Sequence, residues 1–202
     1  MDRRMLLVRA TAFTATLTSG AIAAPREAVI GGRCEGCEWV FDDQPGTLGS
    51  LARIAPANQP GSPMVIKGTV TTLRGAPTPG VIVYAYHTDQ TGIYPPAANR
   101  HGSLRGWALT DAQGRYRFDT IRPGAYPSRN VPEHVHMHVI EPGIGTYYID
   151  NLEFEDDPLN SQRGRTEQRG GDGFMLPVRR DGVWQARRDI VLGRNIPGYP
   201  PR

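Results

Sequence analysis

Cysteine is scarce in this chain of 202 residues, where only Cys34 and Cys37 occur, in the segment RCEGCEW. A four-cysteine zinc site is therefore excluded, because there is no second pair to complete it. A CxxC pair can still be a redox pair, half of a zinc site or a local disulfide. We expect a disulfide that clips the N-terminal arm of an exported chain, with free thiols as the alternative, and we assign the pair no catalytic role.

A strong net charge is also missing. The formal net charge is +3, and it falls to +1 without residues 1–24, which hold three arginines and one aspartate. Such a balance gives no reason to expect a nucleic-acid partner.

The apolar stretch near the N-terminus is too short and too polar to cross a membrane. It follows Arg3 and Arg4 and ends in small residues, the last of them Ala24. This order is typical of a cleavable export signal, and paired arginines are typical of twin-arginine signals. We therefore predict a leader over residues 1–24, no membrane span, and export to the periplasm or the outside of the cell.

Glycine and proline are abundant, with 24 and 18 copies, so long helices are not expected. No internal repeat or second composition block divides the remaining chain, which is long enough for one domain. We predict an all-β fold, an antiparallel β-sandwich with a prealbumin- or immunoglobulin-like core at residues 64–202. An irregular arm precedes it at residues 25–63, and a proline-rich arm ends it. Arms at both ends would suit a homo-oligomer.

Alternating apolar residues predict the strands of this sandwich. One of them, at residues 80–88, carries bulk on both faces and is expected to be central. Hairpin turns are expected at residues 111–114 and 181–182, and a polar loop at residues 160–173. The other predicted strands cover residues 64–70, 115–118, 134–139 and 145–154, and the two arms of a final hairpin at 174–178 and 183–192.

The segment PEHVHMHV points to a metal site. In a strand, His134, His136 and His138 share one face, because successive side chains point to opposite sides. Converging imidazoles favour a transition metal. Tyr94 and Tyr126 lie in nearby proline-flanked segments, and only a strongly Lewis-acidic ion keeps a phenol with a pKa of about 10 ionised at neutral pH. Two phenolates with two imidazoles suit ferric iron.

These residues resemble those of the intradiol ring-cleavage dioxygenases, and within them the protocatechuate 3,4-dioxygenase β-type chains. The resemblance covers about residues 64–160. It rests on four segments in order: GTVTTLRGAPTPGVIVYAYHTDQTGIY, LRGWALTDAQGRYRFDTIRPGAYP, PEHVHMHV and the weaker FEDDPL.

The resemblance implies an Fe(3+) site with Tyr94, Tyr126, His134 and His136 as ligands, and it makes Tyr126 a catalytic proton acceptor. It leaves His138 as an extra imidazole, expected to be packed or to lie behind the ligands. The implied reaction inserts both atoms of O2 into a catechol- or protocatechuate-like substrate. The ring is cleaved between the two hydroxylated carbons, which gives a muconate-type diacid.

One departure from the family pattern concerns charge. The family usually has an arginine three residues before the first histidine, and here that position is Val131. We hypothesise that Arg129, or otherwise Arg122, supplies the missing guanidinium, because losing such a donor from a dry site costs several kcal/mol of barrier. Asn151 lies near the position of a site glutamine in the family.

Two alternatives to the enzyme remain. The chain could bind iron without turnover, having lost its arginine. It could also be a β-sandwich binding module without a metal, because the repeated glycine and proline pattern around its first strands occurs in such modules too.

Overall fold

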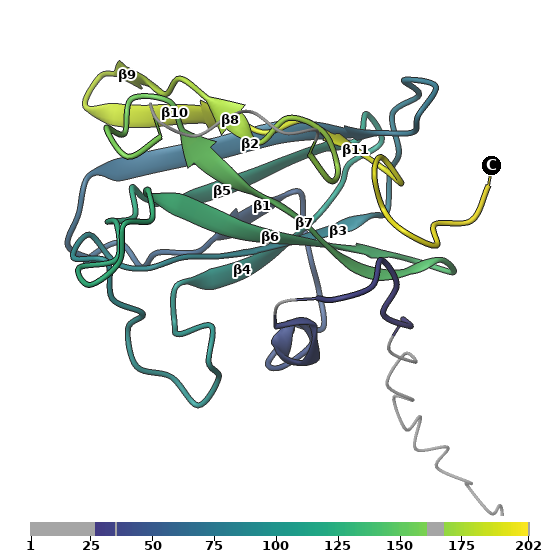
Figure 1. Ribbon diagram of the computed structural model, residues 1–202, viewed down its shortest axis with the longest axis horizontal. Coiled ribbons are helices and arrows are strands. Elements are labelled where there is room, and N and C mark those ends of the chain that lie inside the picture. Colours follow the sequence, from purple (N-terminus) through teal and green to yellow (C-terminus); the bar gives the residue numbers. More distant parts are fainter. Residues whose placement is uncertain (1–26, 35, 161–167, 202) are drawn as a thin grey trace, which may run out of the picture.

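The computed structural model describes residues 27–34, 36–160 and 168–201 (Figure 1). The predicted leader at residues 1–24 lies outside these ranges. The described elements are one 3-10 helix and eleven strands. In order, they are η1 (Cys37–Trp39), β1 (Leu51–Arg53), β2 (Pro63–Thr71), β3 (Ile82–Tyr86), β4 (Arg105–Leu109), β5 (Arg115–Ile121), β6 (His134–Glu141), β7 (Gly145–Phe154), β8 (Phe174–Met175), β9 (Val178–Arg180), β10 (Val183–Arg187) and β11 (Ile190–Val191).

Two sheets form the layers of a sandwich, as predicted (Figure 1). The six-stranded sheet has the order β1-β5-β2-β10-β9, with β11 also paired to β2, and the five-stranded sheet has the order β4-β3-β6-β7-β8. Alternation explains the core between them: in β5, Tyr116 and Phe118 are buried while Arg115 and Arg117 face solvent. The central position predicted for residues 80–88 is confirmed, because β3 pairs with β4 on one side and β6 on the other.

The sheets are not purely antiparallel. Four pairs are parallel, namely β1 with β5, β10 with β2, β11 with β2, and β7 with β8. The segment expected to be an irregular arm also takes part in the fold. It supplies the edge strand β1, and Val29 forms a bridge with Thr146 of β7.

Two expected hairpins are different in the structure. The turn at residues 111–114 forms, with the Gly114 amide donating to the Asp111 carbonyl at 2.8 Å, but it leads from β4 in one sheet to β5 in the other. Residues 174–178 do not form one strand either. They divide near Pro177, which has no N–H for a ladder, so that β8 pairs with β7 while β9 forms the hairpin with β10.

No helix among the described residues has both the length and the apolar character that crossing a membrane requires.

Candidate metal centre and its cavity

The outer face of the five-stranded sheet carries the predicted histidines. His136 lies opposite Tyr86 and His138 opposite Tyr84, in the pairing of β6 with β3. The alternate residues Val135, Met137 and Val139 belong to the sandwich core. The prediction that the imidazoles share one strand face is therefore confirmed.

A bulge in β7 gives this face another polar group. The pairing of β6 with β7 shifts between Val135 and Met137, so that two residues of β7, Asp150 and Asn151, lie opposite His136. Bulges next to functional sites commonly redirect a side chain. Here the Asn151 side chain accepts a hydrogen bond from the Tyr148 hydroxyl at 2.9 Å.

Two loops packed against each other present the tyrosines. Asp89 organises the first loop, because its Oδ1 accepts from the Thr91 amide at 2.8 Å and the Ile93 amide at 3.2 Å, just before Tyr94. The Asp89 carbonyl also accepts from the Gly124 amide at 2.8 Å, two residues before Tyr126. One aspartate thus braces both tyrosine loops.

Close packing between these loops requires glycine at position 92. Gly92 has a φ of 80°, a left-handed conformation that glycine adopts without strain. A Cβ there would collide with the carbonyl of Ala125. The approach keeps Tyr94 close to Tyr126.

The four predicted ligands meet at one point. The hydroxyl oxygens of Tyr94 and Tyr126 are 2.7 Å apart, and the Tyr126 oxygen is 3.4 Å from Nε2 of His136. Nε2 of His136 is in turn 3.0 Å from Nε2 of His134. Neighbouring donors around an ion with bonds of about 2.0–2.2 Å lie roughly 3 Å apart, so these spacings match a coordination shell.

The protonation of the histidines suits the same role. Nδ1 of His134 donates to the Pro132 carbonyl at 2.7 Å, which leaves the lone pair on Nε2. Burial, and then the neighbouring imidazoles of His134 and His138, hold the pKa of His136 well below its usual value of 6.5. Both rings are thus suited to be neutral ligands, and the set of two phenols and two imidazoles fits ferric iron.

A cavity of about 730 Å³ opens beside these donors. Tyr94 and Tyr126 line it, so a small molecule inside could reach the donor atoms. The other lining residues are Gly36, Glu38, Trp39, Tyr86, Gly92, Ile93, Arg100, His101, Pro127, Ser128 and Arg129.

Sequence comparisons agree with this geometry. Residues 45–163, more than half of the chain, match the family profile described as Dioxygenase. The protocatechuate 3,4-dioxygenase beta chain of Burkholderia cepacia is 32% identical over 111 residues, which are 49% of this chain and 47% of that protein. The chain belongs to the intradiol dioxygenase family.

A catechol 1,2-dioxygenase also matches the chain. The catechol 1,2-dioxygenase of Candida albicans is 30% identical over 100 residues, 40% of this chain and 33% of that protein, so the chain spans half or less of the length of these two curated relatives. Among solved structures, the dioxygenase domain of a dioxygenase carbohydrate-binding protein fusion from Streptomyces sp. SirexAA-E superposes with a TM-score of 0.61. It is 23% identical and covers 84% of this chain and 98% of that one, a likeness in fold.

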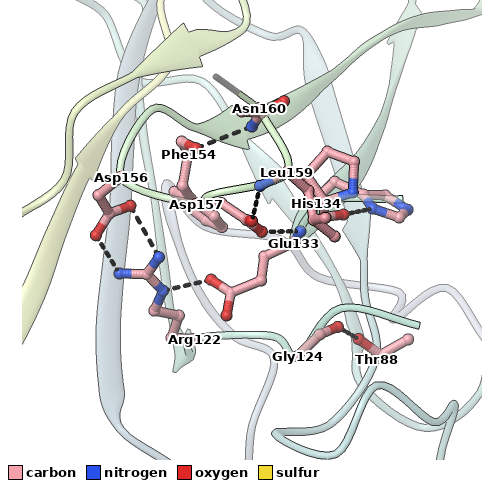
Figure 2. Close-up of polar contacts among 11 residues, drawn as sticks. Thr88, Arg122, Gly124, Glu133, His134, Phe154, Asp156, Asp157, Leu159 and Asn160 are labelled. Atoms are coloured by element: carbon pink, nitrogen blue, oxygen red, sulfur yellow. Dashed lines mark hydrogen bonds and ion pairs between the residues drawn. The ribbon is translucent and has the colours of Figure 1, made fainter. Parts of the chain in front are cut away.

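The two arginines predicted to replace the family guanidinium lie in different places. Arg129 lines the cavity, with its guanidinium carbon 5.7 Å from the centre of the Tyr126 ring. Arg122 is not among the described cavity residues. Its guanidinium donates to Glu133 at 2.6 Å and to both oxygens of Asp156 at 2.7 and 2.8 Å (Figure 2).

The Arg122 network anchors the start of the histidine strand. Glu133, which Arg122 binds, also donates its amide to Asp157 at 2.7 Å (Figure 2). The next residue is His134, whose ring is held by the Pro132 carbonyl. Arg122 therefore helps to fix the position of the strand end that carries His134.

Sequence reasoning missed three residues of the site. Arg100 and His101 line the cavity from an irregular segment that carries no periodic signal. Asp89 did have a signal, since its DQTG segment has the same Asp-x-x-Gly form as the DAQG turn at Asp111.

The likeness between the two segments provides a test of the structural role of Asp89. We expect Asp89→Ala to weaken ferric iron binding by about tenfold, because the loop before Tyr94 loses the carboxylate that organises it, although the backbone bond to Gly124 remains. Asp111→Ala is the matched control, since Asp111 accepts from the Gln113 and Arg115 amides at 2.9 Å in a turn remote from the cavity. Iron titrations followed by visible absorbance measure the iron affinity of both variants. Equal affinities would contradict the role of Asp89 in holding the tyrosine loops.

Proposed function

We propose that the chain is a non-haem iron(III) intradiol dioxygenase. It would insert both atoms of O2 into a catechol-type ring and cleave it between the two hydroxylated carbons, with a muconate-type diacid as product. The observation that carries this proposal is the meeting of the Tyr94, Tyr126, His134 and His136 donor atoms beside a cavity of about 730 Å³. A binding module without a metal would have no need of such a donor set.

The metal and the residues around it have different roles in the proposed reaction. When bound, ferric iron supplies the Lewis acidity that keeps the two phenols ionised and that holds the catechol oxygens. Tyr126 is only half-buried at the cavity wall, so its phenolate oxygen can accept a proton from a catechol hydroxyl. The guanidinium of Arg129 lies over the same ring and stabilises negative charge that develops there.

The cavity lining indicates the substrate. Trp39, Tyr86 and Ile93 offer apolar surface for an aromatic ring. Two arginines, Arg100 and Arg129, outnumber the one carboxylate of the lining, Glu38. A catechol with an anionic substituent, such as a ring carboxylate, would satisfy both the apolar surface and the positive charge. We therefore place protocatechuate-like compounds ahead of unsubstituted catechol.

The first experiment is a visible spectrum of the chain loaded with ferric iron. A tyrosinate-to-iron band that moves to longer wavelength when protocatechuate is added without oxygen, followed by oxygen uptake and diacid formation, supports the proposal. Tyr126→Phe should weaken the band, while Tyr199→Phe, outside the cavity, should leave it intact. A colourless protein would favour the binding module, and colour without ring cleavage would favour an iron-binding member that has lost turnover.

The role of Arg129 has its own test. We expect Arg129→Ala to lower kcat/KM on protocatechuate by about 100-fold, because a charge-stabilising donor is removed from the site. Arg74→Ala, an exposed arginine outside the cavity lining, is the control. Unchanged kcat/KM in Arg129→Ala would end this assignment.

We also propose that the chain is exported. A disulfide joins Cys34 and Cys37, as expected from the sequence, and such bonds persist in oxidising compartments. Cell fractionation of the full chain, compared with one lacking residues 1–24, tests this directly.

A further inference from the structure

The CxxC turn lies against the histidine face of the sheet. In Figure 1 the short helix η1, which contains Cys37, lies beside the five-stranded sheet on the side away from the six-stranded one. The sulfur atoms of Cys34 and Cys37 and a ring nitrogen of His138 all lie within 4.8 Å of one another. Three potential metal donors from two distant segments therefore lie close together.

A fourth donor faces the same turn. His101 is 4% exposed, and its Nδ1 is 2.8 Å from the Tyr84 hydroxyl. Its Nε2 is buried and has no hydrogen-bond partner among the described residues. A Cβ at Gly36, inside the CxxC turn, would collide with this Nε2, so the nitrogen points at the turn. A buried polar atom left without a partner calls for an explanation such as an ion.

We propose that Cys34, Cys37, His101 and His138 form a second metal site, for a borderline-soft divalent cation such as Zn²⁺, when the two cysteines are reduced. The sequence shows only half of this site. The fold supplies the other half, because it brings His101 from the loop before β4 and His138 from β6 to the same turn.

The donor chemistry selects the cation. Two thiolates and two imidazoles are the ligand set of tetrahedral zinc sites, in which bonds of about 2.0–2.3 Å place the donors roughly 3.5 Å apart. The donors of Cys34, Cys37 and His138 already lie within 4.8 Å of one another. His101 would complete the set by turning its Nε2, which points at Gly36, toward them. The iron ligands are phenols and imidazoles of other residues, so the two sites share no donor. Tyr86 separates them, with its ring 3.7 Å from that of His101 and 4.5 Å from that of His136.

The site depends on the redox state of the cysteines. In the structure they form a disulfide, which leaves no thiolate. A dithiol reductant would break the S–S bond by giving two electrons and two protons, and would close to its own disulfide. Binding of the cation then releases the two thiol protons. Because Gly36, Glu38 and Trp39 line the cavity, the bound cation would also fix one of its walls.

Cobalt(II) gives a direct test on the full chain loaded with ferric iron. After anaerobic treatment with a phosphine reductant, one equivalent of Co²⁺ should produce thiolate-to-cobalt charge-transfer bands, which Zn²⁺ should abolish. The chain has only two cysteines, so these bands report this site alone. The oxidised protein should show none, and the test does not depend on whether the iron centre cleaves rings.

Variants separate the built site from binding by the cysteines alone. We expect His101→Asn and His138→Asn each to weaken Co²⁺ binding by more than about tenfold. His87→Gln is the control, since this buried histidine is 2.6 Å from both Thr120 Oγ1 and the Thr88 carbonyl instead. The proposal is overturned if the folded, reduced protein shows no thiolate bands, if both histidine variants bind as tightly as the parent chain, or if reduction in the presence of metal abolishes the near-ultraviolet circular dichroism of the fold.

Discussion

Replacing His136 with alanine is expected to abolish both iron binding and ring cleavage. Nε2 of His136 is the atom that links the other donors, at 3.0 Å from Nε2 of His134 and 3.4 Å from the Tyr126 oxygen. Loss of a residue behind a metal ligand already costs about 10–100-fold in metal affinity, so loss of this ligand should exceed that range. The measurement is the tyrosinate-to-iron band during an iron titration, followed by oxygen uptake with protocatechuate.

A second histidine variant separates ligand loss from general damage. His87 is also fully buried, but its ring is held by Thr88 and Thr120. Burial lowers its pKa to about 4, so it packs as a neutral ring. His87→Gln should keep the iron band even if it lowers stability. An iron affinity that is the same in His136→Ala and the parent chain would remove His136 from the metal centre.

The largest loss of stability is expected for Arg188→Met. Arg188 is fully buried, and its guanidinium has no carboxylate partner among the described hydrogen bonds. Breaking a buried polar cluster of this kind costs about 3–5 kcal/mol of unfolding free energy, because several carbonyls lose their donor. The Arg188 guanidinium is the donor to five such backbone carbonyls at 2.7–3.4 Å, those of Asp150, Arg169, Gly170, Asp172 and Asp189.

The neighbouring residue is a matched control for this prediction. Arg187 pairs with Asp189 at 2.7 Å, but the two side chains are 58% and 50% exposed. An exposed ion pair contributes about 0–1 kcal/mol, so Arg187→Met should change the unfolding free energy little. Urea unfolding curves compare the two variants, and similar midpoints would show that the buried guanidinium is not a structural clamp.

Local patterns predicted which side chains come together better than they predicted the order of the strands. The alternation in PEHVHMHV is a property of one strand, and it held because the bulge opposite His136 adds its extra residue to β7 and not to β6. Turn chemistry at residues 111–114 was also read correctly, but it could not show which sheet the chain enters next. Which sheet the strand joins depends on where Tyr116 and Phe118 can be buried, and the core in which they pack is formed by the whole sandwich.

The less predictable parts of the site come from irregular segments. Arg100 and His101 reach the cavity from a loop without periodicity, so no spacing rule applies to them. The placement of Asn151 depends on a bulge in β7, and nothing in the segment GTYYIDNLEF predicts a bulge at that position. Arg122 had the right residue type for the missing guanidinium, but Glu133 and Asp156 engage it instead.

The parallel pairing of β10 with β2 has a consequence for the order of folding. Thr69, in β2, donates its amide to Asp189, 120 positions along the chain. Contacts this distant form late, because the entropy of closing a long loop opposes them until other structure exists. The sheet that carries His134 and His136 has its four main strands within residues 82–154. A nascent chain would therefore assemble this histidine-bearing sheet first, and the opposite sheet would close only after synthesis of its C-terminal strands.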